Sequence, residues 1–414
     1  MRRWWEGRWR LRRSLRRRDD LRLAGLPLKK ILLIVLVLGI GGLAYWYFSR
    51  QGQAVLDARY REYAYVTNGK SNTVSVIDLR YFRVERTLWV GAEPTWVEAN
   101  PKKNEVYVVN SGSHNISVID VEKNQVVTAI GVHGRPLSIS VSGDGKRGYV
   151  ANSASNNLSV LDLERRAVIT TVRVGAYPVN AVVAPNGTTV VVSNRGDSTV
   201  SLFDTNRLAV RATLPVCSGP DSVVVLPDSG KAFVACPGAN QLAVVDLRNG
   251  RVQALLDVGR NPVHLALKPD GGEIMVSDFD ADSISTIETT TNEVGNTFVI
   301  GNRPACSVVT GDSSRLYVSN FESNSMSVYD IDFGKVLANV PVGRHPDGIA
   351  LTRDEGHVLV LGSESGDVAV VEHRLNPSVR ENEREYWMMT MIPVGAGPNA
   401  IATKSFTLGM PASP

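Results

Sequence analysis

The chain lacks the short motifs that mark several common catalytic and cofactor sites. It has no C-x-x-C-H for covalent haem, no G-x-S-x-G nucleophile turn, no H-E-x-x-H zinc motif and no phosphate-binding loop. Histidine is scarce, and its six copies are scattered without a pair at metal-ligand spacing: His114, His133, His264, His345, His357 and His373. The sequence therefore favours a binding protein over an enzyme.

Beyond its first 30 residues the chain also lacks excess positive charge. Residues 1–30 contain twelve Arg or Lys and three acids, a net charge of +9, whereas the whole chain carries +4. The remainder is therefore slightly acidic, at about −5. We expect no nucleic-acid partner, because nucleic-acid-binding domains present a basic surface.

A strict repeat is present instead. Eight acidic residues recur every 42 positions: Asp78, Asp120, Asp162, Asp204, Asp246, Glu288, Asp330 and Glu372. A V-G-x-x-P turn repeats in the same phase, with prolines at Pro94, Pro136, Pro178, Pro220, Pro262, Pro304 and Pro346, and the last proline, Pro398, follows after 52 residues. This spacing indicates an array of one supersecondary unit, with a ten-residue insertion in the last copy.

Each unit predicts four short strands. Runs rich in Val, Ile, Ser and Tyr alternate in period two and are separated by Gly, Pro, Asn and Asp clusters. In one unit the expected strands a, b, c and d are residues 180–183, 189–194, 199–204 and 210–215. Four antiparallel strands in about 42 residues are typical of one β-propeller blade. The acid at the end of strand c is expected to accept hydrogen bonds from the following turn.

The units resemble the YVTN β-propeller repeat family over residues 60–408. Tyr65-Val66-Thr67-Asn68 followed by residues 73–78 shows the pattern, which returns in phase in the other copies. The resemblance implies a propeller that serves as a binding or interaction scaffold, as in surface-layer-like relatives. Cys236, Asp278 and Gly362 replace the motif's Asn, so differently shaped loops are expected there.

The ends of the array predict how the ring closes. The first unit has strands b, c and d (residues 63–90) without a strand a, and residues 398–402 form a strand a without the others. Joining them removes the exposed sheet edges. We therefore expect an all-β propeller of eight blades over residues 62–408, with seven blades as the alternative, and a short tail at 409–414.

The N-terminal 61 residues predict a membrane anchor. The basic segment 1–30 precedes residues 31–48, eighteen residues without a charge that end in Tyr45-Trp46-Tyr47-Phe48. Such a run fits a transmembrane helix with its N-terminus in the cytoplasm, and it would place the propeller in the periplasm or outside the cell after a linker at 49–61. Cleavage as a signal peptide after Gly42-Leu43-Ala44 is the alternative.

One set of basic residues is expected near the mouth of the central channel. The d-to-a and b-to-c turns share one face of the propeller, which we call the top face. Its d-to-a turns contain Arg135, Arg260, Arg303, Arg344, His133 and His345. These residues could bind an anionic ligand or a protein partner, or they could simply be solvated turn residues beside the acids of neighbouring loops.

Two further sites are considered for metal. Asp278, Asp280 and Asp282 alternate in a b-to-c turn, as Ca²⁺ ligands often do, although the EF-hand pattern fails at Ser283 and Thr289. His264 and Cys306 occupy equivalent positions in adjacent units and could share a metal, or pack as inner-strand residues. Apart from the possible Ca²⁺, no cofactor is expected.

Cysteine placement predicts one disulfide. Cys217 precedes strand a and Cys236 ends strand b of the same unit, so antiparallel pairing brings them together on the top face. An oxidising compartment would permit the bond, and Cys306 would remain a free thiol.

Two enzymatic or cofactor-based alternatives remain open. Some eight-bladed propellers resemble the haem-d domains of nitrite reductases and their assembly partners, and His133 or His345 could then be an axial ligand. A hydrolase or quinoprotein-like oxidoreductase is also possible on this fold, since one fold hosts many sites.

Overall fold

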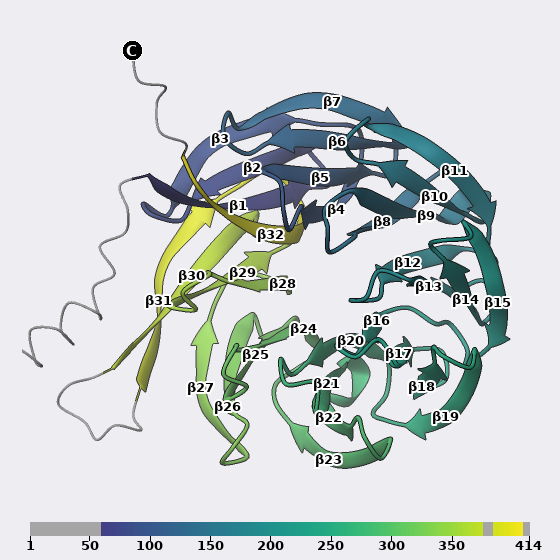
Figure 1. Ribbon diagram of the computed structural model, residues 1–414. Coiled ribbons are helices and arrows are strands. Elements are labelled where there is room, and N and C mark those ends of the chain that lie inside the picture. Colours follow the sequence, from purple (N-terminus) through teal and green to yellow (C-terminus); the bar gives the residue numbers. More distant parts are fainter. Residues whose placement is uncertain (1–58, 376–383, 409–414) are drawn as a thin grey trace, which may run out of the picture. The chain divides into compact units, whose positions relative to one another are not determined.

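Eight four-stranded antiparallel sheets form a ring in the computed structural model, which describes residues 59–375 and 384–408 (Figure 1). The ring belongs to a compact unit beginning at Arg59, separate from residues 1–58. The basic segment, the predicted transmembrane helix, most of the linker and the tail lie outside the described residues. Within the described ranges, no helix is long and apolar enough to cross a bilayer.

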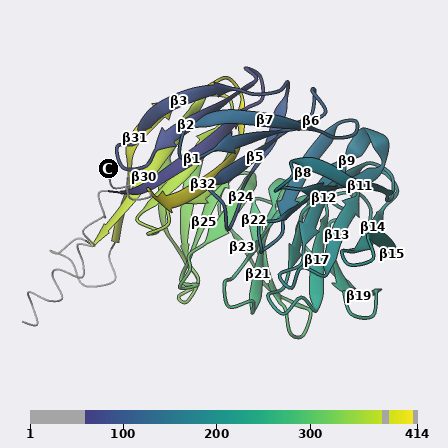
Figure 2. The same ribbon diagram turned by 45° about the horizontal axis from the view of Figure 1, so that its top comes forward.

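The blades follow the repeat. From the innermost to the outermost strand, the sheets are β32 (Pro398–Thr407), β1 (Tyr60–Asn68), β2 (Thr73–Asp78), β3 (Arg83–Trp89); β4 (Pro94–Ala99), β5 (Glu105–Asn110), β6 (Asn115–Asp120), β7 (Gln125–Gly131); β8 (Pro136–Val141), β9 (Arg147–Asn152), β10 (Asn157–Asp162), β11 (Ala167–Arg173); β12 (Pro178–Val183), β13 (Thr189–Asn194), β14 (Thr199–Asp204), β15 (Ala209–Pro215); β16 (Val223–Val225), β17 (Lys231–Cys236), β18 (Gln241–Asp246), β19 (Arg251–Asp257); β20 (Pro262–Leu267), β21 (Glu273–Asp278), β22 (Ser283–Glu288), β23 (Glu293–Val299); β24 (Pro304–Val309), β25 (Arg315–Asn320), β26 (Ser325–Asp330), β27 (Lys335–Pro341); and β28 (Pro346–Leu351), β29 (His357–Gly362), β30 (Asp367–Leu375), β31 (Arg384–Pro393). Figure 2 shows the order β12, β13, β14, β15 from centre to rim. Two 3-10 turns, η1 (Ser153–Ser155) and η2 (Phe279–Ala281), connect second and third strands.

The recurring acid caps the turn after each third strand, as predicted. Asp120 Oδ1 accepts hydrogen bonds from the backbone N–H groups of Glu122, at 3.0 Å, and Lys123, at 3.1 Å. Asp162, Asp204 and Asp246 repeat the arrangement in their own blades. A carboxylate at this position satisfies two turn donors that would otherwise need water.

The motif's Asn ties the second strand to the third. Asn110 Nδ2 donates to Asn115 Oδ1, at 2.8 Å, and to Ser117 Oγ, at 2.9 Å. The same pair of bonds to residues five and seven positions later recurs from Asn68, Asn152, Asn194 and Asn320. The Asn is fully buried in each of these blades, so the repeat pattern reflects a buried polar network.

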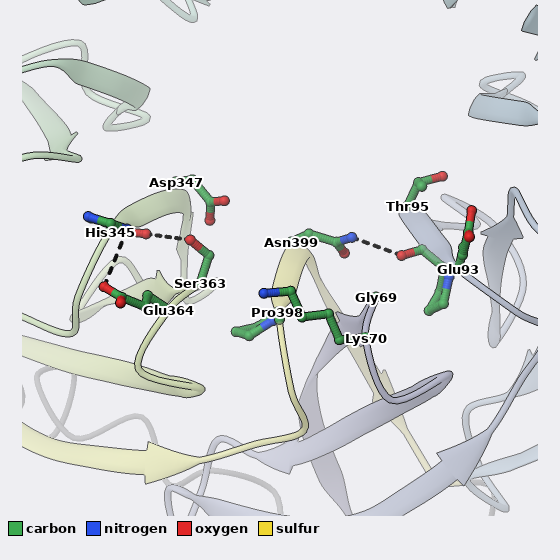
Figure 3. A pocket seen from close by; sticks show the side chains of 12 residues that line it. Gly69, Lys70, Glu93, Thr95, His345, Asp347, Ser363, Glu364, Pro398 and Asn399 are labelled. Atoms are coloured by element: carbon green, nitrogen blue, oxygen red, sulfur yellow. Dashed lines mark hydrogen bonds and ion pairs between the residues drawn. The ribbon is translucent and has the colours of Figure 1, made fainter.

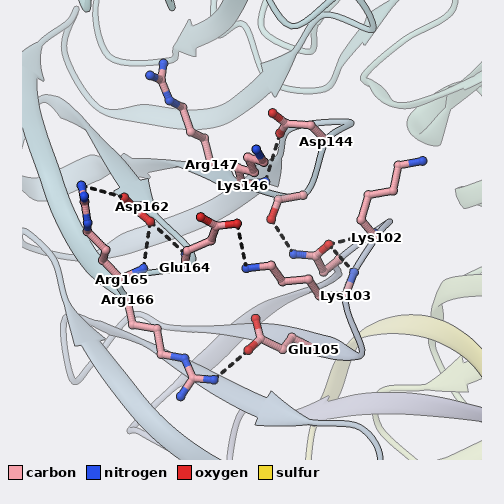
Figure 4. A network of polar contacts seen from close by, with 12 residues as sticks. Lys102, Lys103, Glu105, Asp144, Lys146, Arg147, Asp162, Glu164, Arg165 and Arg166 are labelled. Carbon is pink, nitrogen blue, oxygen red and sulfur yellow. Dashed lines mark hydrogen bonds and ion pairs between the residues drawn. The ribbon is translucent and has the colours of Figure 1, made fainter. Parts of the chain in front are cut away.

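Neighbouring blades share hydrophobic cores. One cluster joins Tyr107 and Val118 of one sheet to Ile139 and Leu161 of the next, and all four are buried. On the face opposite the top, ion pairs also connect these blades: Lys103 lies 3.9 Å from Glu164, and Arg166 lies 2.8 Å from Glu105 (Figure 4). The apolar contacts carry most of the stabilisation, because exposed ion pairs contribute at most about 1 kcal/mol each.

The last strand of the chain closes the ring, which confirms eight blades. β32 pairs antiparallel with β1, from Tyr60 opposite Thr407 to Asn68 opposite Pro398. The ten-residue insertion falls between the third and fourth strands of one blade, where β30 and β31 run beyond the length of their equivalents. Residues 376–383 of that insertion lie outside the described residues.

Candidate functional site at the channel mouth

The turns of the top face share one backbone geometry. The residue before each inner-strand proline has a positive φ, as at Arg135 (52°), Arg303 (54°) and His345 (50°). Its backbone N–H donates to a side chain of the second-to-third-strand turn: His345 N to Asn324 Oδ1 at 2.9 Å, and Arg303 N to Asp282 Oδ1 at 2.8 Å. These bonds hold the left-handed residues in place around the channel mouth.

Three of the four predicted arginines already have partners on this face. Arg260 donates to the Asp280 carbonyl at 2.7 Å. Arg303 lies 3.5 Å from Glu322, and its guanidinium lies over the Phe279 ring. Arg344 lies 3.4 Å from Glu364. The structure thus intersperses these cations with acids and carbonyls, which weakens the hypothesis of a basic rim for an anionic ligand.

The remaining predicted basic residues lie in separate turns. His133 and Arg135 are exposed in the β7–β8 turn. His345, in the β27–β28 turn, stacks on Phe321 at a ring separation of 4.3 Å, and its Nδ1 lies 3.4 Å from Glu364.

The structure does not support the predicted Ca²⁺ site, because its three carboxylates serve different partners. Asp278 is fully buried and accepts a hydrogen bond from Ser285 Oγ at 2.6 Å. Asp280 accepts from Asn261 Nδ2, and Asp282 holds the turn at Arg303 as described above. Among residues 59–375 and 384–408, no three His, Cys, Asp or Glu side chains are arranged to hold a metal ion.

His264 and Cys306 are inner-strand residues with separate environments. His264 Nδ1 accepts a hydrogen bond from Ser307 N at 3.4 Å, and burial lowers the histidine pKa to about 4. Burial raises the pKa of the Cys306 thiol to about 12, and the side chain packs against a hydrophobic cluster. Both therefore remain neutral at physiological pH.

Cys217 and Cys236 are joined by a disulfide in the structure, with Cα atoms 5.7 Å apart. Both residues are buried, and Cys306 is the free cysteine. The bond connects the turn before β16 to the end of β17, on the top face.

A polar pocket of about 520 Å³ opens at the channel mouth, and we call it the mouth pocket. Three adjacent blades contribute its side chains: His345, Asp347, Ser363 and Glu364 from one, Lys70 and Asn399 from the next, and Glu93 and Thr95 from the third (Figure 3). Asn399 is fixed by two hydrogen bonds, from Thr67 Oγ1 at 2.6 Å and to the Pro94 carbonyl at 2.9 Å.

Asp347 is the least satisfied group of this pocket. Its Oδ1 atom is buried and has no hydrogen-bond partner in the described part of the chain. Burial raises the pKa of the carboxyl to about 7, against a smaller opposing effect of a hydrogen bond from Ser363. A buried carboxyl oxygen without a partner is costly, so this atom is suited to receive a ligand's donor.

Sequence analysis missed three inner-strand acids, Asp347, Asp221 and Glu98. Their signal was present, because equivalent positions of other blades hold Val179, Val263 or Ala305 in place of the two aspartates. An acid that replaces an apolar residue in a register known to be innermost points to the channel. Detecting it requires comparing the copies position by position along the inner strand.

The comparisons with known proteins place the chain in a family. A family model described as "Lactonase, 7-bladed beta-propeller" matches residues 63–376. The chain belongs to this family. The matched range ends before β31 and β32, and the ring of this member has eight blades, not seven. No curated protein matches the chain.

Solved structures share its fold at low identity. The Kuenenia stuttgartiensis hydrazine synthase is 18% identical, with a TM-score of 0.51, covering 77% of this chain and 96% of that one. The dihydro-heme d1 dehydrogenase NirN in complex with DHE is 16% identical, with a TM-score of 0.65 and coverages of 82% and 74%. A functionally unknown protein from Desulfotomaculum acetoxidans DSM 771 is 15% identical, with a TM-score of 0.58 and coverages of 73% and 99%. These likenesses show the propeller fold alone.

Proposed function

We propose that this protein is a membrane-anchored, extracytoplasmic propeller that binds a small polar ligand in the mouth pocket. The observation that carries the proposal is the unpartnered, buried Oδ1 of Asp347 in a pocket built from three blades. Rigid strands hold such a pocket in shape, whereas the turns around it are free to vary, and binding sites commonly occupy such places.

The chemistry of the pocket favours a hydroxyl-rich ligand. Thr95, Ser363 and Asn399 offer neutral donors and acceptors, and Lys70 and Glu93 add one charge of each sign. With a pKa of about 7, Asp347 can accept or donate a hydrogen bond near neutral pH. A sugar, a sugar acid or its lactone would match these groups better than a strongly charged or apolar molecule.

Calorimetry on the full chain in detergent tests this proposal with D-glucose, D-gluconate and D-glucono-1,5-lactone as probes. At least one probe should bind, and Asp347→Ala or Asn399→Ala should weaken it about tenfold or more, a loss of roughly 1.4 kcal/mol. Asn302→Ala, in the equivalent turn of another blade, serves as the control and should bind normally. Binding by none of the probes, or equal binding by the mouth variants, would contradict the proposal.

Lactone hydrolysis is a second candidate, favoured by the family's description and by the pKa of Asp347. The carboxylate would take a proton from a water molecule as that water attacks the lactone carbonyl, and the ring C–O bond would open to give the hydroxy acid. Acid release from gluconolactone, followed by pH-stat, should then exceed the spontaneous rate. Asp347→Asn should abolish the excess while leaving lactone binding in place. An unchanged rate in that variant would reject the hydrolytic role.

The haem-d alternative remains compatible with the fold of NirN but has less support from the residues. His345 stacks on Phe321 and lies beside Glu364, while His133 is in another turn. A purified chain with a visible haem absorption band would favour this alternative over the binding proposal.

The proposed location is supported by the uncharged run at residues 31–48 and by a disulfide, which persists in oxidising compartments. Cell fractionation should recover the full chain in the membrane fraction, with the propeller digested by protease added from outside the cytoplasm. A propeller protected until the membrane is dissolved would reverse the proposed orientation.

A further inference from the structure

A second cavity lies within the ring and is distinct from the mouth pocket. It measures about 350 Å³ and is lined by side chains of the inner strands β4, β8, β12, β16 and β20; we call it the inner cavity. Its charged lining residues are Glu98 and Asp221, and neither Lys nor Arg is among the lining residues in the described part of the chain. His264, which also lines it, is neutral for the reason given above.

The two acids differ in how their charge is compensated. Asp221 forms an ion pair with Arg195 from the top face. Glu98 instead has the Trp96 indole as its hydrogen-bond partner, and burial raises the pKa of its carboxyl to about 7. No cation contributes to that pKa, so Glu98 is the acid of this cavity without a compensating positive charge.

Trp96 is an exception to the repeat. The equivalent inner-strand positions of other blades hold small or polar residues: Ser138, Asn180, Ser222, His264, Cys306, Gly348 and Ala400. Ser138, for example, accepts a hydrogen bond from Ala181 N of the next blade. Trp96 remains 37% exposed although it lines a cavity, so part of an aromatic ring is open beside a carboxylate.

We propose that the inner cavity binds a small organic ammonium ion, held by the Trp96 ring and the Glu98 carboxylate. The negative face of an indole attracts a cation, and the attraction strengthens where water is excluded. The carboxylate adds an ion pair that neutralises its own buried charge. An ammonium ion with apolar substituents satisfies both groups, whereas an anion would meet two acids and a neutral histidine.

Choline and its neutral isostere 3,3-dimethylbutan-1-ol test this inference by calorimetry on the full chain in detergent. Choline should bind at least about tenfold more tightly than the alcohol, because the shapes are alike and only the charge differs. Glu98→Gln and Trp96→Leu should each weaken choline about tenfold, and Trp96→Phe should weaken it less. Trp89→Leu, on the outer strand β3 where the indole is 77% exposed, is the control and should bind choline normally.

Several results would overturn the inference: no binding of choline, equal binding of choline and the alcohol, or unchanged affinity in Glu98→Gln. Glu98→Asp provides a second test if the Gln variant does not fold, and it should keep the preference for choline over the alcohol. Asp347→Ala should leave choline binding intact, since Asp347 lines the mouth pocket and not the inner cavity. This variant separates the inference from the proposed function, on which it does not depend.

Discussion

One atom distinguishes Asp278 from the Asn that ends the second strand in most blades. Asn320 Nδ2 donates to Ser327 Oγ at 2.7 Å, whereas Asp278 has no N–H and instead accepts from Ser285 Oγ at 2.6 Å. The side chain is fully buried, and this burial raises the pKa of the Asp278 carboxyl from 3.8 to about 6. Above that pH the blade holds a buried negative charge that its Asn-containing equivalents avoid.

Asp278→Asn should therefore stabilise the propeller at pH 8 and have little effect at pH 4. A folded-state pKa above the unfolded value stabilises the fold below about pH 4, and this contribution is lost as the pH rises through about 6. The gain at pH 8 should be about 1–3 kcal/mol, since two pKa units correspond to roughly 3 kcal/mol at most. Urea unfolding across this pH range measures it. The reverse change, Asn320→Asp, should create the same pH dependence in another blade, and a flat profile in both variants would refute the account.

The blade of β16–β19 shows how one element replaces the buried Asn network. Cys236 occupies the Asn position, and Ala243 replaces the Ser that accepts its bond in other blades. The innermost strand β16 has only three residues, against six in most other blades. The disulfide from Cys236 to Cys217 fixes the turn before β16, where the strand ladder is shortest.

Removing this disulfide should destabilise the propeller by about 3 kcal/mol, the chain-entropy value for a loop of this size. Cys217→Ser with Cys236→Ser tests the loss by urea unfolding. Adding Asn at position 236 and Ser at position 243 should recover part of it, because the Asn–Ser hydrogen bond of the other blades can then form. A thiol reagent should titrate one thiol, Cys306, per unreduced, denatured chain. Two or three thiols would show that the bond does not form.

The repeat predicted these elements closely because burial repeats along with the sequence. The expected strands 189–194 and 199–204 are β13 and β14 as observed, and the a and d strands differ by one or two residues at one end. The candidate site was harder to predict. Alternation along strand a does not reveal which side chains line a cavity, so Asp347 and Glu98 were missed. Asp282 read as a metal ligand, yet it holds a turn through Arg303 N, a contact set by the pairing of two turns 21 residues apart.

At the scale of the whole molecule, ring closure depends on the pairing of β32 with β1. A chain ending at Gly397 should lose cooperative unfolding, because β1 would become an unpaired inner edge and the blades would separate more readily. A chain ending at Leu408 retains the pairing and is the matched control. Circular dichroism during thermal unfolding should show one sharp transition for the control and a broad or absent one for the shorter chain. Equal transitions would mean that closure contributes little to stability.

The pairing of Tyr60 with Thr407 also sets the time at which the protein can mature. A ribosome makes β1 among the first strands but synthesises its partner last, after every other blade. During translation the inner edge of β1 remains open, and a chain tethered early to a membrane would wait there with that edge exposed. Translation speed and the chaperones that shield strand edges should therefore govern its yield more than that of a domain whose first and last segments do not pair.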